Sequence, residues 1–121
     1  MYEYKATIIK IVDGDTVDVD IDLGFDIWRR NERIRLHGCD TPECRTRNKK
    51  EKAHGLLAKE YVQKALVVGR TYALTTKEKG KFGRWLGTIW ELNEDKPEFE
   101  NSYNKQLINE GLAKEYWGGK R

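Results

Sequence analysis

The feature that most constrains the fold is a strict alternation of apolar and acidic residues from Thr16 to Leu23. Val17, Val19 and Ile21 fall on one side of an extended chain, and three aspartates fall on the other. A period of two gives an apolar face to a strand and not to a helix, so the run predicts a strand with one buried surface. The preceding Asp13-Gly14 pair is a hairpin signal, which predicts pairing with the strand before it.

Around this hairpin the patterns predict one domain over residues 1–121, with further strands and two helices. We expect strands at Lys5–Asp13, Glu32–Gly38, Thr71–Thr76 and Trp85–Trp90, and helices at Lys50–Val67 and Ser102–Glu110. Gly24 to Asn31 is expected to form a loop or hairpin tip, in which Trp28 is either a cap on the barrel edge, the favoured interpretation, or an exposed contact residue. The order βββαββα is that of a five-stranded OB-fold-type β-barrel with helices, an α+β fold.

The net charge of +3 says little, but the charges are unevenly distributed. Asp13 to Asp26 holds six aspartates and no Lys or Arg, whereas Arg29 to Lys52 holds nine Lys or Arg against four acidic residues. An acidic stretch beside a basic one suits a cation site next to a polyanion site. The basic part from Cys44 to Lys52 reads equally as a solvated loop or as an electrostatic guide for phosphates.

Two carboxylates and two arginines are candidates for chemistry. Asp15 and Asp40 each lie at a strand end, and with a backbone carbonyl they offer oxygens to a hard cation such as Ca²⁺. Glu43 follows across a proline turn, where it can orient or deprotonate water. Arg35 and Arg84 carry planar donor forks suited to phosphate oxygens. Together these groups suit in-line attack on a phosphodiester.

Each motif also has a plainer interpretation. An Asp-Gly-Asp turn is more often only a turn, and strand arginines usually extend to solvent. Asp18, Asp20 and Asp22 are expected to face solvent rather than to bind a metal, because side chains along one strand face diverge from a single point.

The motifs in order carry a resemblance. Residues 11–17 (Ile-Val-Asp-Gly-Asp-Thr-Val), Arg35-Leu36, residues 40–43 (Asp-Thr-Pro-Glu), residues 81–84 (Lys-Phe-Gly-Arg) and residues 111–114 (Gly-Leu-Ala-Lys) resemble the staphylococcal nuclease (thermonuclease) family. The match runs in order over most of the chain. It implies an OB-fold-type barrel and calcium-dependent cleavage of DNA and RNA that leaves 3′-phosphate ends.

Carried over by motif, the resemblance implies a role for each position. Asp15 and Asp40 resemble the calcium-ligating aspartates, Thr41 the residue whose backbone carbonyl binds calcium, and Glu43 the carboxylate that orients or activates water. Arg35 and Arg84 resemble the phosphate-binding arginines, and Asp13 a second aspartate beside the metal. Lys49 and Lys81 fall where the family has basic residues near the nucleotide.

The sequence also departs from the family pattern. Phe82 stands where the pattern has a tyrosine, the segment between Asp15 and Arg35 is longer, and the third helix is expected to be missing or very short. Tyr116 or Trp117 is expected to supply an aromatic wall for a base.

The favoured hypothesis is a metal-dependent nuclease acting as a monomer on single-stranded or frayed DNA and RNA. The alternatives are a non-catalytic OB-fold module that binds nucleic acid or protein, and a domain that calcium only stabilises. No hydrophobic run is long enough to span a membrane and no signal segment follows Met1, so the expected compartment is the cytoplasm unless a natural precursor carries a signal.

Overall fold

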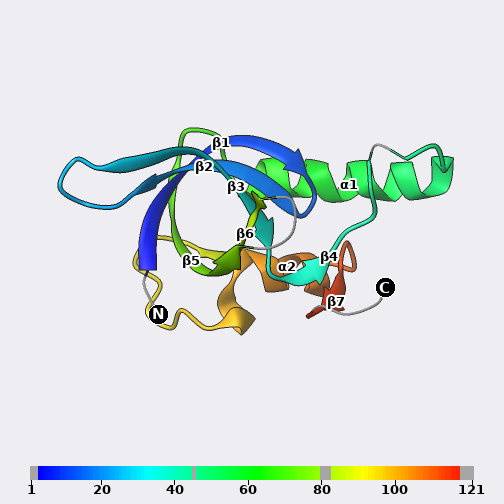
Figure 1. Cartoon of the computed structure of the whole chain (residues 1–121). Helices are drawn as coiled ribbons and strands as arrows, with labels where there is room; N and C mark the ends of the chain where they lie inside the picture. Colours follow the sequence, from blue (N-terminus) through cyan, green and yellow to red (C-terminus); the bar gives the residue numbers. More distant parts are fainter. Residues whose placement is uncertain (1–2, 45, 80–82, 118–121) are drawn as a thin grey trace.

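The computed structural model describes residues 3–44, 46–79 and 83–117. Five of its strands close into a barrel, in the order β1-β2-β3-β6-β5, with two helices against it (Figure 1). The elements in chain order are β1 (Glu3–Asp13), β2 (Thr16–Asp22), β3 (Trp28–Leu36), β4 (Gly38–Asp40), α1 (Lys49–Ala65), β5 (Thr71–Lys79), β6 (Trp85–Trp90), the 3₁₀ turn η2 (Phe99–Asn101), α2 (Tyr103–Asn109) and β7 (Lys114–Tyr116). The predicted OB-fold-type barrel is confirmed.

The alternating run forms β2, as predicted, and its valines line the barrel interior. Val17 and Val19 are fully buried and pair with Ile11 and Ile8 of β1. Removing such side chains from water is the main favourable term that the barrel offers, about 1.5–3 kcal/mol for each fully buried aliphatic residue. The parallel pairing of β3 with β6, through Ile34 and Trp85, closes the barrel.

The acidic face of β2 is neutralised by its own hairpin. Asp18 binds Arg33 at 2.9 Å and Asp20 binds Arg30 at 3.0 Å, and all four groups lie at the surface. The Asp22 carboxylate accepts from the Gly24 N–H at 2.8 Å. Asp18 and Asp20 thus form a cross-strand ion-pair ladder between β2 and β3.

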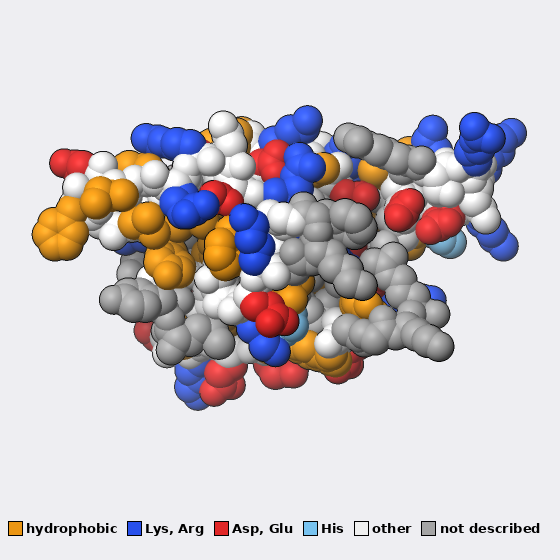
Figure 2. Space-filling model, viewed as in Figure 1, with side chains coloured by type: hydrophobic (Ala, Val, Ile, Leu, Met, Phe, Trp, Pro, Cys, Tyr) orange, Lys and Arg blue, Asp and Glu red, His pale blue; other side chains and the backbone are white. Residues whose placement is uncertain are grey.

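The predicted start of the third strand at Glu32 is wrong, because β3 begins at Trp28 and continues the hairpin beyond the barrel (Figure 1). Trp28 lies on this projection with 37% of its surface exposed, and the Arg30 guanidinium lies 4.6 Å from its ring centroid. It therefore does not cap the barrel edge. Figure 2 shows hydrophobic side chains gathered at this projecting end and Lys and Arg side chains at the opposite end, where α1 begins.

Two short strands were not predicted. β3 ends at Leu36, and Gly38–Asp40 forms a separate strand, β4, that pairs antiparallel with β7. Asp40 is the partner of Lys114 in this pairing. The stretch before Glu43 is thereby tied to a segment more than 70 positions away in the chain.

Helix α1 begins directly after an N-cap residue, Asn48. The Asn48 side chain accepts hydrogen bonds from the backbone N–H groups of Lys50 and Glu51, and the helix ends at Ala65 rather than Val67. Gly55 in its second turn allows a close approach, because a Cβ there would lie 2.6 Å from the Glu43 carbonyl. This glycine thus lets α1 pack directly on the backbone of the Glu43 segment.

Helix α2 is held to the barrel by a buried amide. Ser102 caps its start, and Asn104, fully buried, donates to the carbonyls of His37 and Gly87 and accepts from the Ile89 N–H. Each of these bonds satisfies a group that would otherwise be buried without a partner. No helix among the described residues is both long and apolar enough to cross a membrane.

Candidate functional site

Two aspartates and an arginine, from one turn and two strands, meet beside the barrel. Arg35 on β3 contacts Asp15, from the β1–β2 turn, at 3.3 Å through Nη1, and Asp40 on β4 at 3.1 Å through Nη2. All three side chains are largely withdrawn from solvent, with 9%, 11% and 19% of the side-chain surface exposed, respectively. The carboxylates that the sequence separates by 25 positions therefore face one point.

Arg35 also binds the backbone on both sides of the β3–β4 connection. Its Nη1 donates to the Leu36 carbonyl at 3.1 Å and to the Cys39 carbonyl at 2.9 Å. These bonds fix the sharp connection from β3 to β4 at Gly38, whose φ of 82° suits glycine. The guanidinium is thus held in a single orientation, with donors still turned toward the carboxylates.

Asp15 and Thr41 are linked directly. The Thr41 N–H donates to Asp15 Oδ2 at 3.2 Å, and the Asp15 carbonyl accepts from the Leu36 N–H at 2.8 Å. The Thr41 hydroxyl is buried, and it has no hydrogen-bond partner among the described residues. It lies against Gly14, where a Cβ would come within 2.9 Å of it. Glycine at position 14 is therefore needed for the turn to reach Thr41.

Glu43 lies on the exposed side of the same segment. Its backbone N–H donates to Glu51 of α1 at 3.5 Å, while its own side chain is exposed. The neighbouring Cys44 is buried, and its hydrogen bond to Asp13 contributes, after burial, to a raised pKa of its thiol. Asp13 also accepts from the Gly14 N–H at 2.8 Å. Asp13 therefore joins the Asp15 turn to the residue after Glu43.

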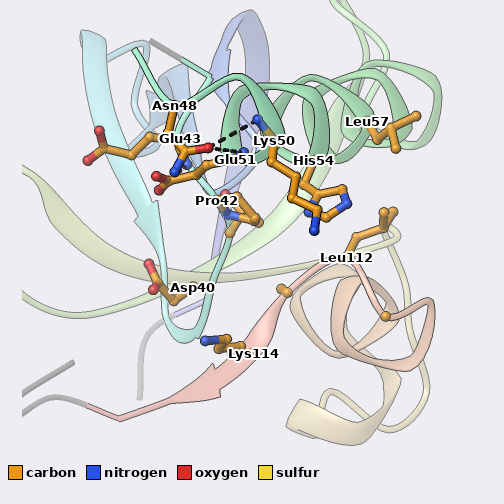
Figure 3. A pocket seen from close by; sticks show the side chains of 13 residues that line it. Asp40, Pro42, Glu43, Asn48, Lys50, Glu51, His54, Leu57, Leu112 and Lys114 are labelled. Atoms are coloured by element: carbon orange, nitrogen blue, oxygen red, sulfur yellow. Dashed lines mark hydrogen bonds between the residues drawn. The ribbon is translucent and has the colours of Figure 1, made fainter. Parts of the chain in front are cut away.

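A groove of about 670 Å³ opens from this segment between α1 and the chain before β7 (Figure 3). Carboxylates lie toward one end, with Lys114 beside Asp40; leucines lie toward the other end, and Lys50 and His54 lie between the two. The lining residues are Asp40, Thr41, Pro42, Glu43, Asn48, Lys50, Glu51, His54, Leu57, Gly111, Leu112, Ala113 and Lys114. Only some of these were candidates from sequence. Lys50, His54 and Leu57 escaped notice because their shared face on α1 points at a segment distant in sequence.

The other predicted site residues lie at different distances from this groove. Arg84 directly precedes β6, in which Leu86 is the register partner of Arg35, and its Nε is buried. Lys49 is the exposed first residue of α1, at the basic end of the molecule. Lys81 lies outside the described residues, as does Phe82.

The two aromatic candidates lie on the β7 side, and neither lines the groove. Tyr116 is half-buried and pairs with Gly38. The Trp117 ring packs edge-on to His37, with centroids 5.0 Å apart, and also against Phe99, and 51% of its surface is exposed. They face a surface adjacent to β4.

Burial sets the electrostatics beneath the site. Burial, followed by the nearby Asp15 carboxylate, raises the pKa of the Cys39 thiol to about 12, so this thiol stays protonated. Burial, followed by the cationic Lys77, lowers the pKa of His37 below its usual value. Neither group adds charge next to Arg35 at neutral pH. The main electrostatic interactions of the guanidinium are therefore those with the Asp15 and Asp40 carboxylates.

The oxygen donors fit a hard cation in part. Asp15 Oδ2 and Asp40 Oδ1 contact the same guanidinium, so both oxygens border one small volume. Among the residues that the structure describes, no three histidine, cysteine, aspartate or glutamate side chains gather into a metal site. Two carboxylates with carbonyl and water oxygens still make a set that Ca²⁺ accepts, since it takes six to eight oxygens in flexible geometry.

Comparison with known proteins gives a consistent result. The sequence model of the family described as staphylococcal nuclease homologue matches residues 33–120. The thermonuclease of Staphylococcus intermedius is 33% identical over 106 residues, which are 87% of this chain and 55% of the relative. The thermonuclease of Staphylococcus hyicus is 30% identical over 113 residues, 93% of this chain and 59% of the relative.

A third relative is the protein ParB of Escherichia coli, 29% identical over 116 residues, 94% of this chain and 58% of the relative. The chain thus spans just over half the length of the curated relatives it matches.

Proposed function

The chain belongs to the family of staphylococcal nuclease homologues, and from that membership we propose that it is a calcium-dependent nuclease. Its proposed reaction is hydrolysis of phosphodiester bonds in DNA or RNA to leave 3′-phosphate ends. The observation that carries the proposal is the convergence of Asp15, Arg35 and Asp40 on one point, next to an open groove that Asp40 and Glu43 line.

Calcium would be held by the carboxylates of Asp15 and Asp40 and by the Thr41 carbonyl. When bound, the ion supplies positive charge that stabilises a phosphate gaining negative charge. The buried Thr41 segment, fixed by its N–H bond to Asp15, keeps these oxygens from rearranging. Preorganised groups cost no reorganisation at the moment of reaction, which supports this assignment.

Arg35 and Arg84 would bind the phosphate. Arg35 has five N–H donors, and its bonds to carbonyls and carboxylates leave hydrogens on Nη2 and Nε for phosphate oxygens. Leu86, two residues after Arg84, is the register partner of Arg35. Strand alternation therefore favours one sheet face for both arginines, from which they would stabilise the five-coordinate phosphorus.

Glu43 would act on water. Its carboxylate is exposed on the rim of the groove, so it can orient a water molecule or take a proton from it. A 3′-phosphate product requires that the bond from phosphorus to the 5′ oxygen breaks and that a 5′-hydroxyl leaves. The exposed lysines at the start of α1, with Lys49 first, would attract the polyanion. Lys81, Tyr116 and Trp117 would contact the flanking nucleotides of a single-stranded or frayed substrate.

A cleavage assay tests the proposal. Purified protein is incubated with single-stranded DNA and with RNA, in calcium, in magnesium and in chelator, and the product ends are mapped. We expect cleavage in calcium, loss of cleavage in chelator, and 3′-phosphate ends. Intact substrate in calcium would refute the proposal, and binding without cleavage would favour a non-catalytic module instead.

A further inference from the structure

Charged and apolar side chains follow one another along the groove in an order that catalysis at Asp40 and Glu43 does not require. From the carboxylates, with Lys114 beside Asp40, it passes Lys50 and His54 and ends at Leu57 and Leu112 (Figure 3). Its volume of about 670 Å³ is within the range of small-molecule sites, about 300–1,000 Å³. The site therefore has space beyond what one phosphate and one metal ion fill.

The far end of the groove is apolar and open. Leu57 projects from α1 with 54% of its surface exposed, and Leu112 faces the same space from the segment before β7. An exposed leucine in a concave lining leaves apolar surface in contact with water, which is unfavourable in free energy unless a ligand covers the surface. The flat face of a nucleobase is such a ligand.

The middle of the groove carries donors suited to a phosphate. Lys50 and Lys114 are exposed ammonium groups. Lys114 lies beside Asp40 at the carboxylate end, and Lys50 and the imidazole of His54 lie between that end and the leucines. The order of groups is thus carboxylates with one cation, then Lys50 and His54, then an apolar wall. A nucleotide chain that enters from the scissile phosphate presents phosphate, sugar and base in an order that matches it.

We propose that this groove is a subsite for the nucleotide next to the scissile phosphate, with its base against Leu57 and Leu112 and its phosphate near Lys50 and Lys114. The inference rests on the proposed nuclease function and extends it, since it assigns a binding site on α1 for an unstacked base. A base bound there must leave its stack, so the subsite selects single-stranded over duplex substrate at this position. The alternative occupant is a protein segment. Occupancy by an apolar protein segment would not explain why cationic side chains line the groove beside the carboxylates.

The first experiment measures binding apart from cleavage. A fluorescent trinucleotide of deoxythymidine is titrated in chelator against the natural protein, Leu57→Ser and Leu56→Ser, and gel analysis verifies that it stays intact. Leu56 is the matched control, because it is exposed to a similar extent on the same helix and does not line the groove. We expect about tenfold weaker binding for Leu57→Ser and no change for Leu56→Ser. Thermal melting verifies that both variants fold.

The second experiment removes the base instead of the leucine. Oligonucleotides with one abasic position are bound and cleaved by the natural protein and by Leu57→Ser. At a single position next to the cut, removal of the base should weaken binding about tenfold in the natural protein and should abolish the difference between the two proteins.

The outcomes separate the two claims. Equal binding by Leu57→Ser and the natural protein, equal effects of all abasic positions, or no trinucleotide binding would each overturn the subsite, whereas cleavage in calcium would still stand. A change in sedimentation on Leu57→Ser without a change in nucleotide binding would assign the groove to a second copy of the chain, and would also overturn it.

Discussion

At the scale of the residue, the site divides into a buried part that also holds the fold and an exposed part that does not. Arg35 ties two carbonyls and two carboxylates together within the β3–β4 connection. Its removal would leave buried charges without a partner, so its effects on folding and on cleavage cannot be separated. Glu43 has an exposed side chain, and its role can be tested alone.

Replacing Glu43 by glutamine should therefore act on cleavage and not on folding. Because the amide cannot take a proton and orients water poorly, we expect the rate to fall about 10²–10⁴-fold. The free energy of unfolding should change by less than about 0.5 kcal/mol, as for other exposed positions. Initial rates in calcium and denaturant titration measure the two quantities. Glu51→Gln, in the same groove, is the control and should keep most of the activity; equal losses in both variants would refute the assignment to Glu43.

At the scale of the element, the packing of α1 depends on the absence of a side chain at position 55. A Cβ at Gly55 would lie 2.6 Å from the Glu43 carbonyl and 2.7 Å from the Cys44 nitrogen, and both are backbone atoms that cannot turn aside. Glycine in a helix costs about 1 kcal/mol relative to alanine. The chain accepts this cost because the helix then reaches the segment that carries Glu43.

Gly55→Ala should consequently destabilise the protein although alanine favours the helix. Overpacking costs about 1–3 kcal/mol, which exceeds the gain in helix propensity, and the displaced Glu43 segment should lower the cleavage rate. Ala53→Gly, at an exposed position of the same helix, is the control: it should lose about 1 kcal/mol of stability and keep its cleavage rate. Denaturant unfolding and initial rates give both values. A stabilised and fully active Gly55→Ala protein would contradict this, because it would show that α1 can move away from the Glu43 backbone without loss of stability or activity.

The projecting β2–β3 hairpin ends in a strained turn. Phe25 and Asp26 have φ angles of 55° and 60°, and the Ile27 N–H donates to the Gly24 carbonyl at 3.0 Å. Two central residues with positive φ define a type I′ turn, in which asparagine and glycine are preferred. Phe25 is 99% exposed and so gains no packing in return for this strain.

Phe25→Asn should therefore stabilise the protein by about 0.5–1 kcal/mol, because asparagine adopts the left-handed conformation at lower cost. Thermal melting measures the gain. Ile27→Asn is the control, since Ile27 is exposed in the same turn without a positive φ, and it should give no increase. A fall in stability on Phe25→Asn would contradict the prediction, because it would show that the phenylalanine ring stabilises the folded chain.

At the scale of the whole molecule, what the sequence could predict depended on the range of the interactions. The barrel strands were predictable because alternation, as in Val17 and Val19, is a local signal of a buried face. The early start of β3 at Trp28 was missed, since its cause is the ion-pair ladder between Asp18, Asp20 and the hairpin arginines. The β4–β7 pairing joins three-residue strands far apart in sequence, for which no local pattern exists.

The candidate site shows the same division. Asp15, Arg35 and Asp40 could be proposed from their types and order, and the fold brings them together. The groove could not be proposed, because Leu57 and Leu112 become neighbours only when α1 packs beside the segment before β7. Likewise the role of Gly55 could not be proposed, because its neighbour, the Glu43 backbone, reaches the helix only in the folded chain.

Because Asp15 lies in the β1–β2 turn and Asp40 lies on β4, only the folded chain presents both to a metal ion. Calcium that binds there should stabilise the fold by RT ln(1 + [Ca²⁺]/Kd), about 2.7 kcal/mol at a hundredfold excess over Kd. The melting temperature should rise with calcium, and Asp40→Asn should remove most of this rise. Asp18→Asn is the control, because Asp18 is paired on the outer ladder and should keep the full response. A melting temperature independent of calcium would show that the folded chain binds no calcium, and an equal response in Asp40→Asn would place the metal elsewhere; either result would remove the assigned role of Asp15 and Asp40.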